Sequence, residues 1–295
     1  MKNILFLILL LSYSINAQNH MLVGEGSASG CEYDNDEICA WVTKIEDNGD
    51  TAPSSGQLGD IDDMVSALKT DGIWSTLDVF YLFAQDGSKG AGEVNMVDPD
   101  SYGLTEPGSS VTWTSDVGIT PYISSDNKYY NSNYNPNTAG GNFSQNDAHL
   151  TTMVSNSNIT SSVVYFAGAI QSTYFIRMYL YSPSDLRLYA YLNSNGQTTI
   201  TVTRDSNNHM LSGSRTGATT YNSYIDGGSA AANSSPSTGV PNYNIYIGAL
   251  NNGGSLAGGA FATPPKIQIA CWGGSLTSGE ISDLWDTLNT YIDGL

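Results

Sequence analysis

Four consecutive segments between residues 163 and 204 alternate apolar and polar side chains with a period of two. They read VVYFAGAIQ (163–171), TYFIRMYLYS (173–182), DLRLYAYLNS (185–194) and TTITVTR (198–204). This period is typical of β-strands that bury one face. In the third segment one face carries Leu186, Leu188, Ala190 and Leu192, and the other carries Arg187, Tyr189, Tyr191 and Asn193. The pattern therefore predicts a sheet with two chemically different faces.

Three later segments add strands: TTYNSYID (219–226), NYNIYIGAL (242–250) and PKIQIACW (265–272). Asn195-Gly196, between two of the first four segments, is a strong hairpin signal. Serial strands joined by short polar turns predict an all-β antiparallel sandwich or jelly roll. The composition agrees, since the chain has 31 Gly, 19 Tyr and only 13% charged residues, against a usual charged share of about 25%.

Two helices are expected beside the strands. DIDDMVSALKT (60–70) places apolar residues at helical spacing, and Gly72 ends the run. The last twenty residues, 276–295, do the same, with Ile281, Leu284, Trp285, Leu288 and Tyr291 on one face. We expect this second helix to dock against the sandwich.

The N-terminus has the features of an exported protein. One Lys precedes an apolar run from Ile4 to Leu11 that is too short to cross a bilayer, and a small residue, Ala17, follows. Residues 1–17 are therefore predicted to be a signal peptide, 18–40 an acidic Gly/Ser-rich arm, and 41–295 one sandwich domain. No later apolar run is long enough for a membrane span, which predicts a secreted or cell-surface protein.

The charge of the chain excludes some partners. A formal net charge of −18 and a pI near 4.1 argue against binding nucleic acid or anionic membranes, because both require basic patches. An acidic, Tyr- and Asn-rich secreted chain suits neutral partners such as glycans, or divalent cations, instead.

Several strings, in this order along the chain, resemble a known module: GIWSTLDVFYLFAQDGS (72–88), EVNMVDP (93–99), YYNSNYNPN (129–137), SGSRTGATTYNSYIDGG (212–228) and NIYIGALNNGGSLAGG (244–259). Together they resemble the laminin-G-like module found in phage tail and other phage structural proteins, over roughly residues 41–295. The resemblance implies a concanavalin A-like lectin/glucanase sandwich that is non-catalytic and binds glycans or builds surface and virion appendages. The signal peptide favours an exported protein over a virion protein.

The stretch CEYDNDEIC (31–39) contains Glu32-x-Asp34-x-x-Glu37, the order of carboxylates in laminarinase-type enzymes of this fold. Such enzymes hold two carboxylates about 5–5.5 Å apart, on a core strand with apolar residues between them. Here the intervening residues are polar, and a predicted Cys31–Cys39 disulfide closes a nine-residue loop. A solvated acidic loop is favoured, with a cation site left open, and no catalytic residue is predicted. Cys271 is expected to be a buried, inert thiol.

Binding residues are predicted in two groups. Carbohydrate recognition is assigned to Tyr129, Tyr130, Tyr134, Asn131 and Asn135 in NKYYNSNYNPN, because rings stack on sugars and amides satisfy hydroxyls. The alternative is ordinary strand packing and turn chemistry. Calcium is an open possibility at Asp98, Asp100, Asp116 and Asp126, whose alternative is again turn chemistry. Tyr189 and Tyr191 are candidates for a second sheet or a homo-oligomer contact.

The sequence thus favours a non-catalytic exported surface or appendage protein with lectin-like recognition of a glycan or polysaccharide. A purely structural subunit of a virion or extracellular assembly is the first alternative. A glucanase is the second.

Overall fold

The computed structural model describes residues 33–120, 127–155, 163–181, 185–203, 205–258 and 265–295. The predicted signal peptide, Cys31, Glu32 and Asp126 lie outside the described residues. Residues 31–295 belong to one compact unit, to which the following description refers. None of the described helices is long and apolar enough to cross a membrane.

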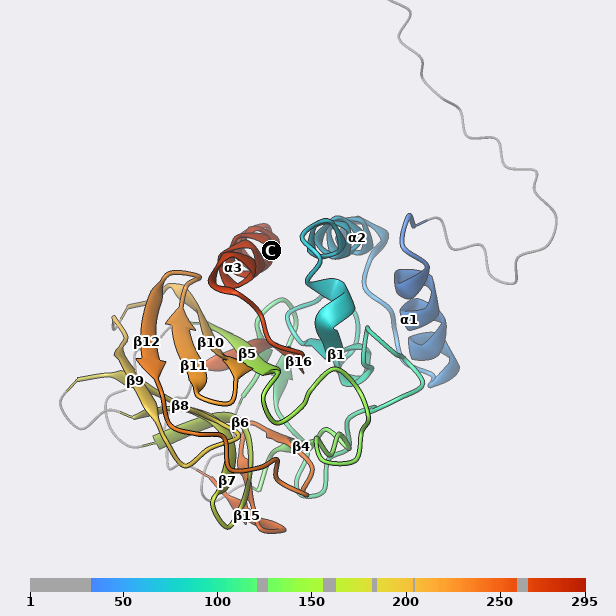
Figure 1. The fold of residues 1–295 in the computed structure, drawn as a ribbon. Coiled ribbons are helices and arrows are strands. Elements are labelled where there is room, and N and C mark those ends of the chain that lie inside the picture. The colour runs from blue at the N-terminus through green and yellow to red at the C-terminus, as the bar shows by residue number, and fades with distance from the viewer. Residues whose placement is uncertain (1–32, 121–126, 156–162, 182–184, 204, 259–264) are drawn as a thin grey trace, which may run out of the picture. The chain divides into compact units, whose positions relative to one another are not determined.

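The described strands form two sheets (Figure 1). Sheet A has the order β12 (Ser229–Asn233), β11 (Thr220–Ile225), β10 (Asn208–Gly217), β5 (Ala148–Ser155), β16 (Lys266–Gly273), β3 (Gly118–Ile119) and β2 (Trp113–Thr114), and β1 (Leu77–Leu82) also pairs with β16. Sheet B has the order β15 (Ser255–Ala257), β14 (Leu250–Asn252), β6 (Val163–Gln171), β7 (Tyr174–Tyr181), β8 (Arg187–Leu192) and β9 (Thr198–Thr201), and β13 (Tyr246–Ile247) links β6 to β4 (Tyr130–Asn131). Neighbouring strands are antiparallel except β14 and β6, which run parallel.

The main core lies between the two sheets. Alternate residues of β7 and β8 enter it, as the period of two predicts: Ile176, Met178, Leu180, Leu188, Ala190 and Leu192. Sheet A contributes residues such as Val79, Tyr81, Leu150 and Trp272. One predicted outward residue differs, because Asn193 has a positive φ of 57° and is buried. Its side-chain amide donates to the carbonyls of Ser144 and Gln145 at 2.9 and 3.0 Å.

A second core lies on the outer face of sheet A, beneath three helices: α1 (Asp36–Asp47), α2 (Ser55–Thr70) and α3 (Ser278–Asp293). Figure 1 shows α2 and α3 beside one another on that side of the sheet. The sheet contributes Phe80, Leu82, Met153, Ile269 and Cys271, and the helices cover them with apolar side chains. We call this outer surface of sheet A the helix-covered face. Cys271 is a free, buried thiol, as predicted, and burial raises its pKa to about 12.

The predicted all-β sandwich with a helix before it and a helix after it is confirmed. Gly72, with φ of 76°, follows α2, and a Thr277–Glu280 capping box begins α3. The predicted strand 242–250 is divided into β13 and β14 by Gly248, whose φ is 80°.

Helix α1 was not predicted. It crosses the expected boundary between an arm and a domain at residue 40, since Ile38, Trp41 and Ile45 are fully buried beneath the same helical layer. The physical reason is its period: these three apolar residues lie three and four positions apart and form one helical stripe.

Candidate functional site

The three tyrosines predicted to stack on sugar are buried, with exposed fractions of 9% for Tyr129, 0% for Tyr130 and 1% for Tyr134. Tyr130 stacks on Phe83 with ring centroids 5.9 Å apart, and its hydroxyl donates to Glu93 at 2.8 Å. Burial, and then the charge of Glu93, raises the pKa of Tyr130 well above its ordinary value. The prediction that these three rings stack on a sugar is therefore wrong, because other groups of the protein already cover them.

Tyr134 shows how such a ring is held. Its hydroxyl donates to Asp78 at 2.6 Å, and its ring packs edge-on against Tyr102 and Trp272. Asp78 also accepts from the backbone N–H groups of Asn142 and Phe143. Tyr134 therefore closes the sandwich core.

The two predicted amides serve turns. The side-chain oxygen Oδ1 of Asn131 accepts from the backbone N–H of Asn133 at 3.0 Å, and Oδ1 of Asn135 accepts from the backbone N–H of Asn137 at 3.0 Å. The Asn135 amide nitrogen also donates to Asn242 at 2.9 Å. These contacts are the turn chemistry that was the alternative to sugar binding.

The three predicted calcium residues that the structure describes, Asp98, Asp100 and Asp116, do not form a group that could hold a metal ion. Asp100 pairs with Lys44 at 2.7 Å, and Asp116 accepts from Gln57 at 3.0 Å. Among the described residues, no three His, Cys, Asp or Glu side chains form a group that could hold a metal ion. Asp126 lies outside the described residues, and calcium binding stays a prediction.

The structure describes residues 33–39 of the acidic stretch, and residues 36–39 form the start of α1 where a loop was expected. Glu37 lies in the first turn of α1, and its carboxylate accepts from Lys69 at 2.5 Å. Burial acts to raise the pKa of Glu37, but the hydrogen bond and charge of Lys69 outweigh it and the pKa is lowered. Asp62 accepts from the backbone N–H groups of Asp34 and Asn35, both at 3.0 Å. A carboxyl with a lowered pKa does not suit a general acid. Cys39 is disulfide-bonded, and its pairing with Cys31 stays a prediction.

The outer face of sheet B carries a row of tyrosines. The register pairs Tyr165 of β6 with Tyr179 of β7, Tyr179 with Tyr189 of β8, and Tyr189 with Thr199 of β9. Tyr179 and Tyr189 stack with centroids 5.1 Å apart and planes 5° apart, and Tyr165 lies 5.2 Å from Tyr179. All three rings are half-buried. Burial raises the pKa of Tyr179 above its ordinary value, so its hydroxyl stays neutral.

Arg177 lies in the adjacent row, between Gly168 and Tyr191. Its guanidinium carbon is 4.1 Å from the ring centre of Tyr191, 5.1 Å from that of Phe175 and 5.2 Å from that of Tyr179. Gly168 is needed there, because a Cβ at this position would lie 2.9 Å from that of Arg177. We call these residues together the aromatic face: Tyr165, Phe175, Arg177, Tyr179, Tyr181, Tyr189 and Tyr191.

No described helix packs on the aromatic face, since α1, α2 and α3 all lie on the other side, over sheet A (Figure 1). The sequence placed Tyr189 and Tyr191 on the strand face that points away from the core, and the register agrees, although Tyr191 is buried there and Tyr189 is half-buried. The sequence did not identify Tyr165, Arg177 and Tyr179. The alternation of side chains in residues 163–171 and 173–182 could have placed these three residues on the outer face. The aromatic face presents flat amphipathic rings, hydroxyl groups and one guanidinium, and these groups are suited to binding a ligand.

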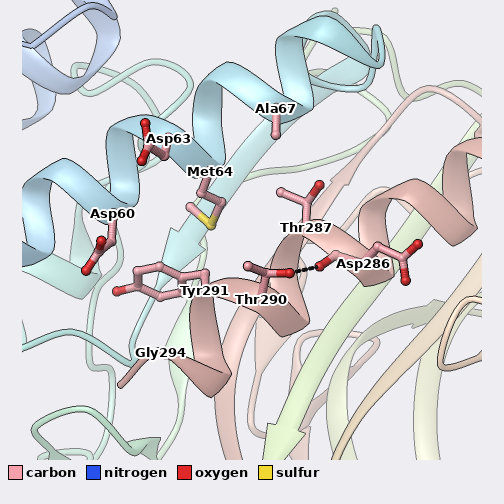
Figure 2. Close-up of a pocket in the computed structure, with 9 residues that line it drawn as sticks. All are labelled: Asp60, Asp63, Met64, Ala67, Asp286, Thr287, Thr290, Tyr291 and Gly294. Carbon is pink, nitrogen blue, oxygen red and sulfur yellow. Dashed lines mark hydrogen bonds between the residues drawn. The ribbon is translucent and has the colours of Figure 1, made fainter.

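Hollows lie elsewhere in the described part of the unit, and two of them are next to α3. A groove of about 460 Å³ lies between α2 and α3. Figure 2 shows the side chains of Met64 and Tyr291 between the two helices, with Asp60 and Asp63 on α2 and Asp286 on α3. Met64 and Tyr291 are buried, and the Tyr291 hydroxyl donates to the carbonyl of Ala84 at 2.9 Å. The groove therefore lies over residues that already belong to the helical core.

A second hollow of about 520 Å³ lies beside His209, at the edge of α3, where Trp285 and Asn289 contribute to it. His209 is held between Asp226, 2.8 Å from Nδ1, and Asp205, 2.9 Å from Nε2. Burial acts to lower the pKa of His209, but the hydrogen bonds and charges of Asp226 and then Asp205 outweigh it and raise the pKa. Both ring nitrogens are engaged, so this histidine has no free nitrogen for a catalytic or ligand role.

No protein-family model and no curated protein matches this chain. Solved structures are similar to it in fold. Trypanosoma rangeli sialidase matches with a TM-score of 0.50 and 10% identity, over 80% of this chain and 40% of its own. A mutant of that sialidase displaying trans-sialidase activity matches with a TM-score of 0.50 and 11% identity over the same shares. A structure of botulinum neurotoxin type C, whose cell entry is dependent upon interaction with two ganglioside molecules, gives 0.49 and 10% over 74% of this chain and 53% of its own.

The chain thus spans about half or less of the length of these solved chains. At such identities the likeness concerns the fold alone. It agrees with the sandwich described above.

Proposed function

We propose that this protein is a non-catalytic, lectin-like carbohydrate-binding protein that binds its ligand on the aromatic face. The observation that carries the proposal is the row of Tyr165, Tyr179 and Tyr189, three half-buried rings side by side with no described helix over them. Tyr rings combine an apolar body with a polar tip, so they suit ligands that are apolar on one side and hydroxylated on the other. A sugar ring has this character.

The same face lacks the groups of the common glycosidases. Most glycoside hydrolases use two Asp or Glu residues on either side of the scissile bond. The described strands of sheet B contain neither residue type. The aromatic face is therefore proposed to bind a carbohydrate without hydrolysing it.

An exported surface or appendage role is part of the proposal. It is supported by the apolar run Ile4–Leu11 followed by Ala17, which has the form of a signal peptide. A role in a virion or other extracellular assembly is the second candidate, and the half-buried tyrosines favour it equally, because such rings are enriched in protein interfaces.

The test is a pull-down of the chain from Gln18 onwards against a panel of insoluble polysaccharides, with calcium and with EDTA. Tyr189→Ala is expected to abolish binding, and Tyr189→Phe to keep it, because stacking requires the ring. Tyr174→Ala is the matched control, since Tyr174 lies on the neighbouring strand β7, packs against Gly239 and lies outside the aromatic face. The EDTA arm tests the predicted calcium.

Two other readouts separate the alternatives. Release of reducing ends into the supernatant would contradict the non-catalytic proposal. Sugar-independent self-association in light scattering, lost in Tyr189→Ala while no polysaccharide binds, would favour the structural candidate.

A further inference from the structure

Arg177 differs from the other cations in the described part of the chain. Each of the others has an oxygen partner: Lys44 with Asp100, Lys69 with Glu37, Lys89 with Glu106, Lys128 with Thr112, Arg187 with Asp185, Arg215 with Leu192 and Lys266 with Thr120. The guanidinium of Arg177 lies over the rings of Phe175, Tyr179 and Tyr191, and its buried Nε has no hydrogen-bond partner. The chain therefore fixes a guanidinium on the aromatic face without supplying an acceptor for it.

The charges around Arg177 leave room for an anion. Only four of the 28 carboxylates lie between residues 127 and 279: Asp147, Asp185, Asp205 and Asp226. The described strands of sheet B contain two arginines and no Asp or Glu. In a chain with a net charge of −18, this face is a local exception where a negative ligand meets little repulsion, because exposed charges beyond about 8–10 Å are largely screened.

We propose that the ligand of the aromatic face is a polysaccharide with carboxylate-bearing sugar residues, that is, uronic acid units. Its sugar rings stack on Tyr179 and Tyr189, and a carboxylate accepts hydrogen bonds from Arg177. The inference rests on the proposed carbohydrate-binding function and adds the substrate class. It revises the expectation from net charge alone, which favoured neutral glycans.

Arg177 suits a carboxylate for two reasons. A guanidinium presents parallel N–H donors that match the two oxygens of a carboxylate, which a lysine ammonium does not. Its stacking on Tyr191 and Phe175 fixes its position before the ligand arrives, so little side-chain entropy is lost on binding. The stacking also removes part of its water, which strengthens a charge-assisted hydrogen bond at that place.

The experiment compares matched polymers by affinity gel electrophoresis. Carboxymethylcellulose is set against hydroxyethylcellulose, polygalacturonate against its methyl ester, and the sulfated polymer κ-carrageenan against agarose. The proteins are the wild type, Arg177→Met, Arg177→Lys and Arg187→Met. Arg187→Met is the matched control, because it removes one arginine from the same sheet, but one that is exposed and paired with Asp185.

The wild type is expected to bind the carboxylated polymer more tightly than its neutral partner in the first two pairs. Arg177→Met is expected to weaken that binding about tenfold or more, the size of one charge-assisted hydrogen bond, and to leave binding of the neutral partner unchanged. Arg177→Lys should fall in between, and Arg187→Met should resemble the wild type. Thermal melting of Arg177→Met, expected close to the wild type because Met keeps the apolar stem, excludes simple unfolding.

Equal loss of acidic and neutral binding in Arg177→Met would overturn the inference, since Arg177 would then only support the rings. Preference for the sulfated polymer without carboxylate binding would overturn it too. Failure of the wild type to bind any polysaccharide would instead overturn the proposed function itself.

Discussion

On the outer face of sheet A, Phe80, Met153 and Ile269 lie beneath three helices, whereas on the outer face of sheet B, Tyr165, Tyr179 and Tyr189 have no described helix over them. Both faces are built by the same alternation of side chains along strands. Of these six side chains, the three purely apolar ones are buried, and the three with a polar tip are half-buried. The large side chains of the helix-covered face therefore stabilise the fold, whereas those of the aromatic face are available for binding.

The largest expected effect breaks the helix-covered face. Trp41→Ala removes a fully buried ring whose Nε1 donates to the carbonyl of Val94 at 3.3 Å. The loss of packing and the cavity left behind are expected to lower the free energy of unfolding by about 3–5 kcal/mol. Urea denaturation followed by far-UV circular dichroism measures it. A loss below about 1 kcal/mol, a value typical of half-exposed sites, would mean that α1 is not part of the folded unit.

A smaller effect separates core tyrosines from those of the aromatic face. Tyr134→Phe leaves the Asp78 carboxylate with only two backbone donors, so we expect it to cost about 1.5–3 kcal/mol, as for hydrogen bonds to charged groups. Tyr189→Phe is the matched change, since no hydrogen bond engages that hydroxyl among the described residues, and it should leave stability unchanged. Both variants are measured by urea denaturation. Equal costs would remove the distinction between the two kinds of tyrosine.

The third prediction concerns the aromatic face itself. Tyr189→Ala removes ring contacts with Tyr179 and Tyr181, and cross-strand pairs contribute roughly 0.2–1 kcal/mol each. We therefore expect a stability loss of about 1 kcal/mol, well below that of Trp41→Ala, together with the loss of glycan binding proposed above. A loss as large as that of Trp41→Ala would show that this face is sealed in the folded protein.

The sequence was sufficient to predict β6 to β9 of sheet B and the helices α2 and α3, because their periods are local, but it did not predict β4 or β15. It was insufficient for Tyr130 and Tyr134, because tyrosine suits both a core and a binding surface. The partners Glu93 and Asp78 that satisfy these hydroxyls are 37 and 56 residues away. The tyrosine row also depends on strand register, which the alternation alone does not determine. A one-residue slip between β7 and β8 would move Tyr189 to the opposite face.

The smallest expected effect lies at the edge of the helix-covered face, where His209 is held by Asp205 and Asp226. Its pKa is raised above 6.5 in the folded chain, so the folded state binds the His209 proton more tightly than the unfolded state does. The stabilisation is therefore complete below the unfolded pKa near 6.5 and is lost as the pH rises through the folded pKa. Thermal melting between about pH 6 and pH 9 should show a steeper fall for the wild type than for His209→Gln.

Parallel melting curves for the two proteins would contradict this role of His209. The same series should leave glycan binding by the aromatic face unaffected, because His209 lies on β10 of sheet A and none of its hydrogen-bond partners belongs to sheet B. A change of pH that alters stability but not glycan binding would then show that the two faces of the protein function independently. Coupled changes would mean instead that the order of one sheet depends on the ion pairs of the other.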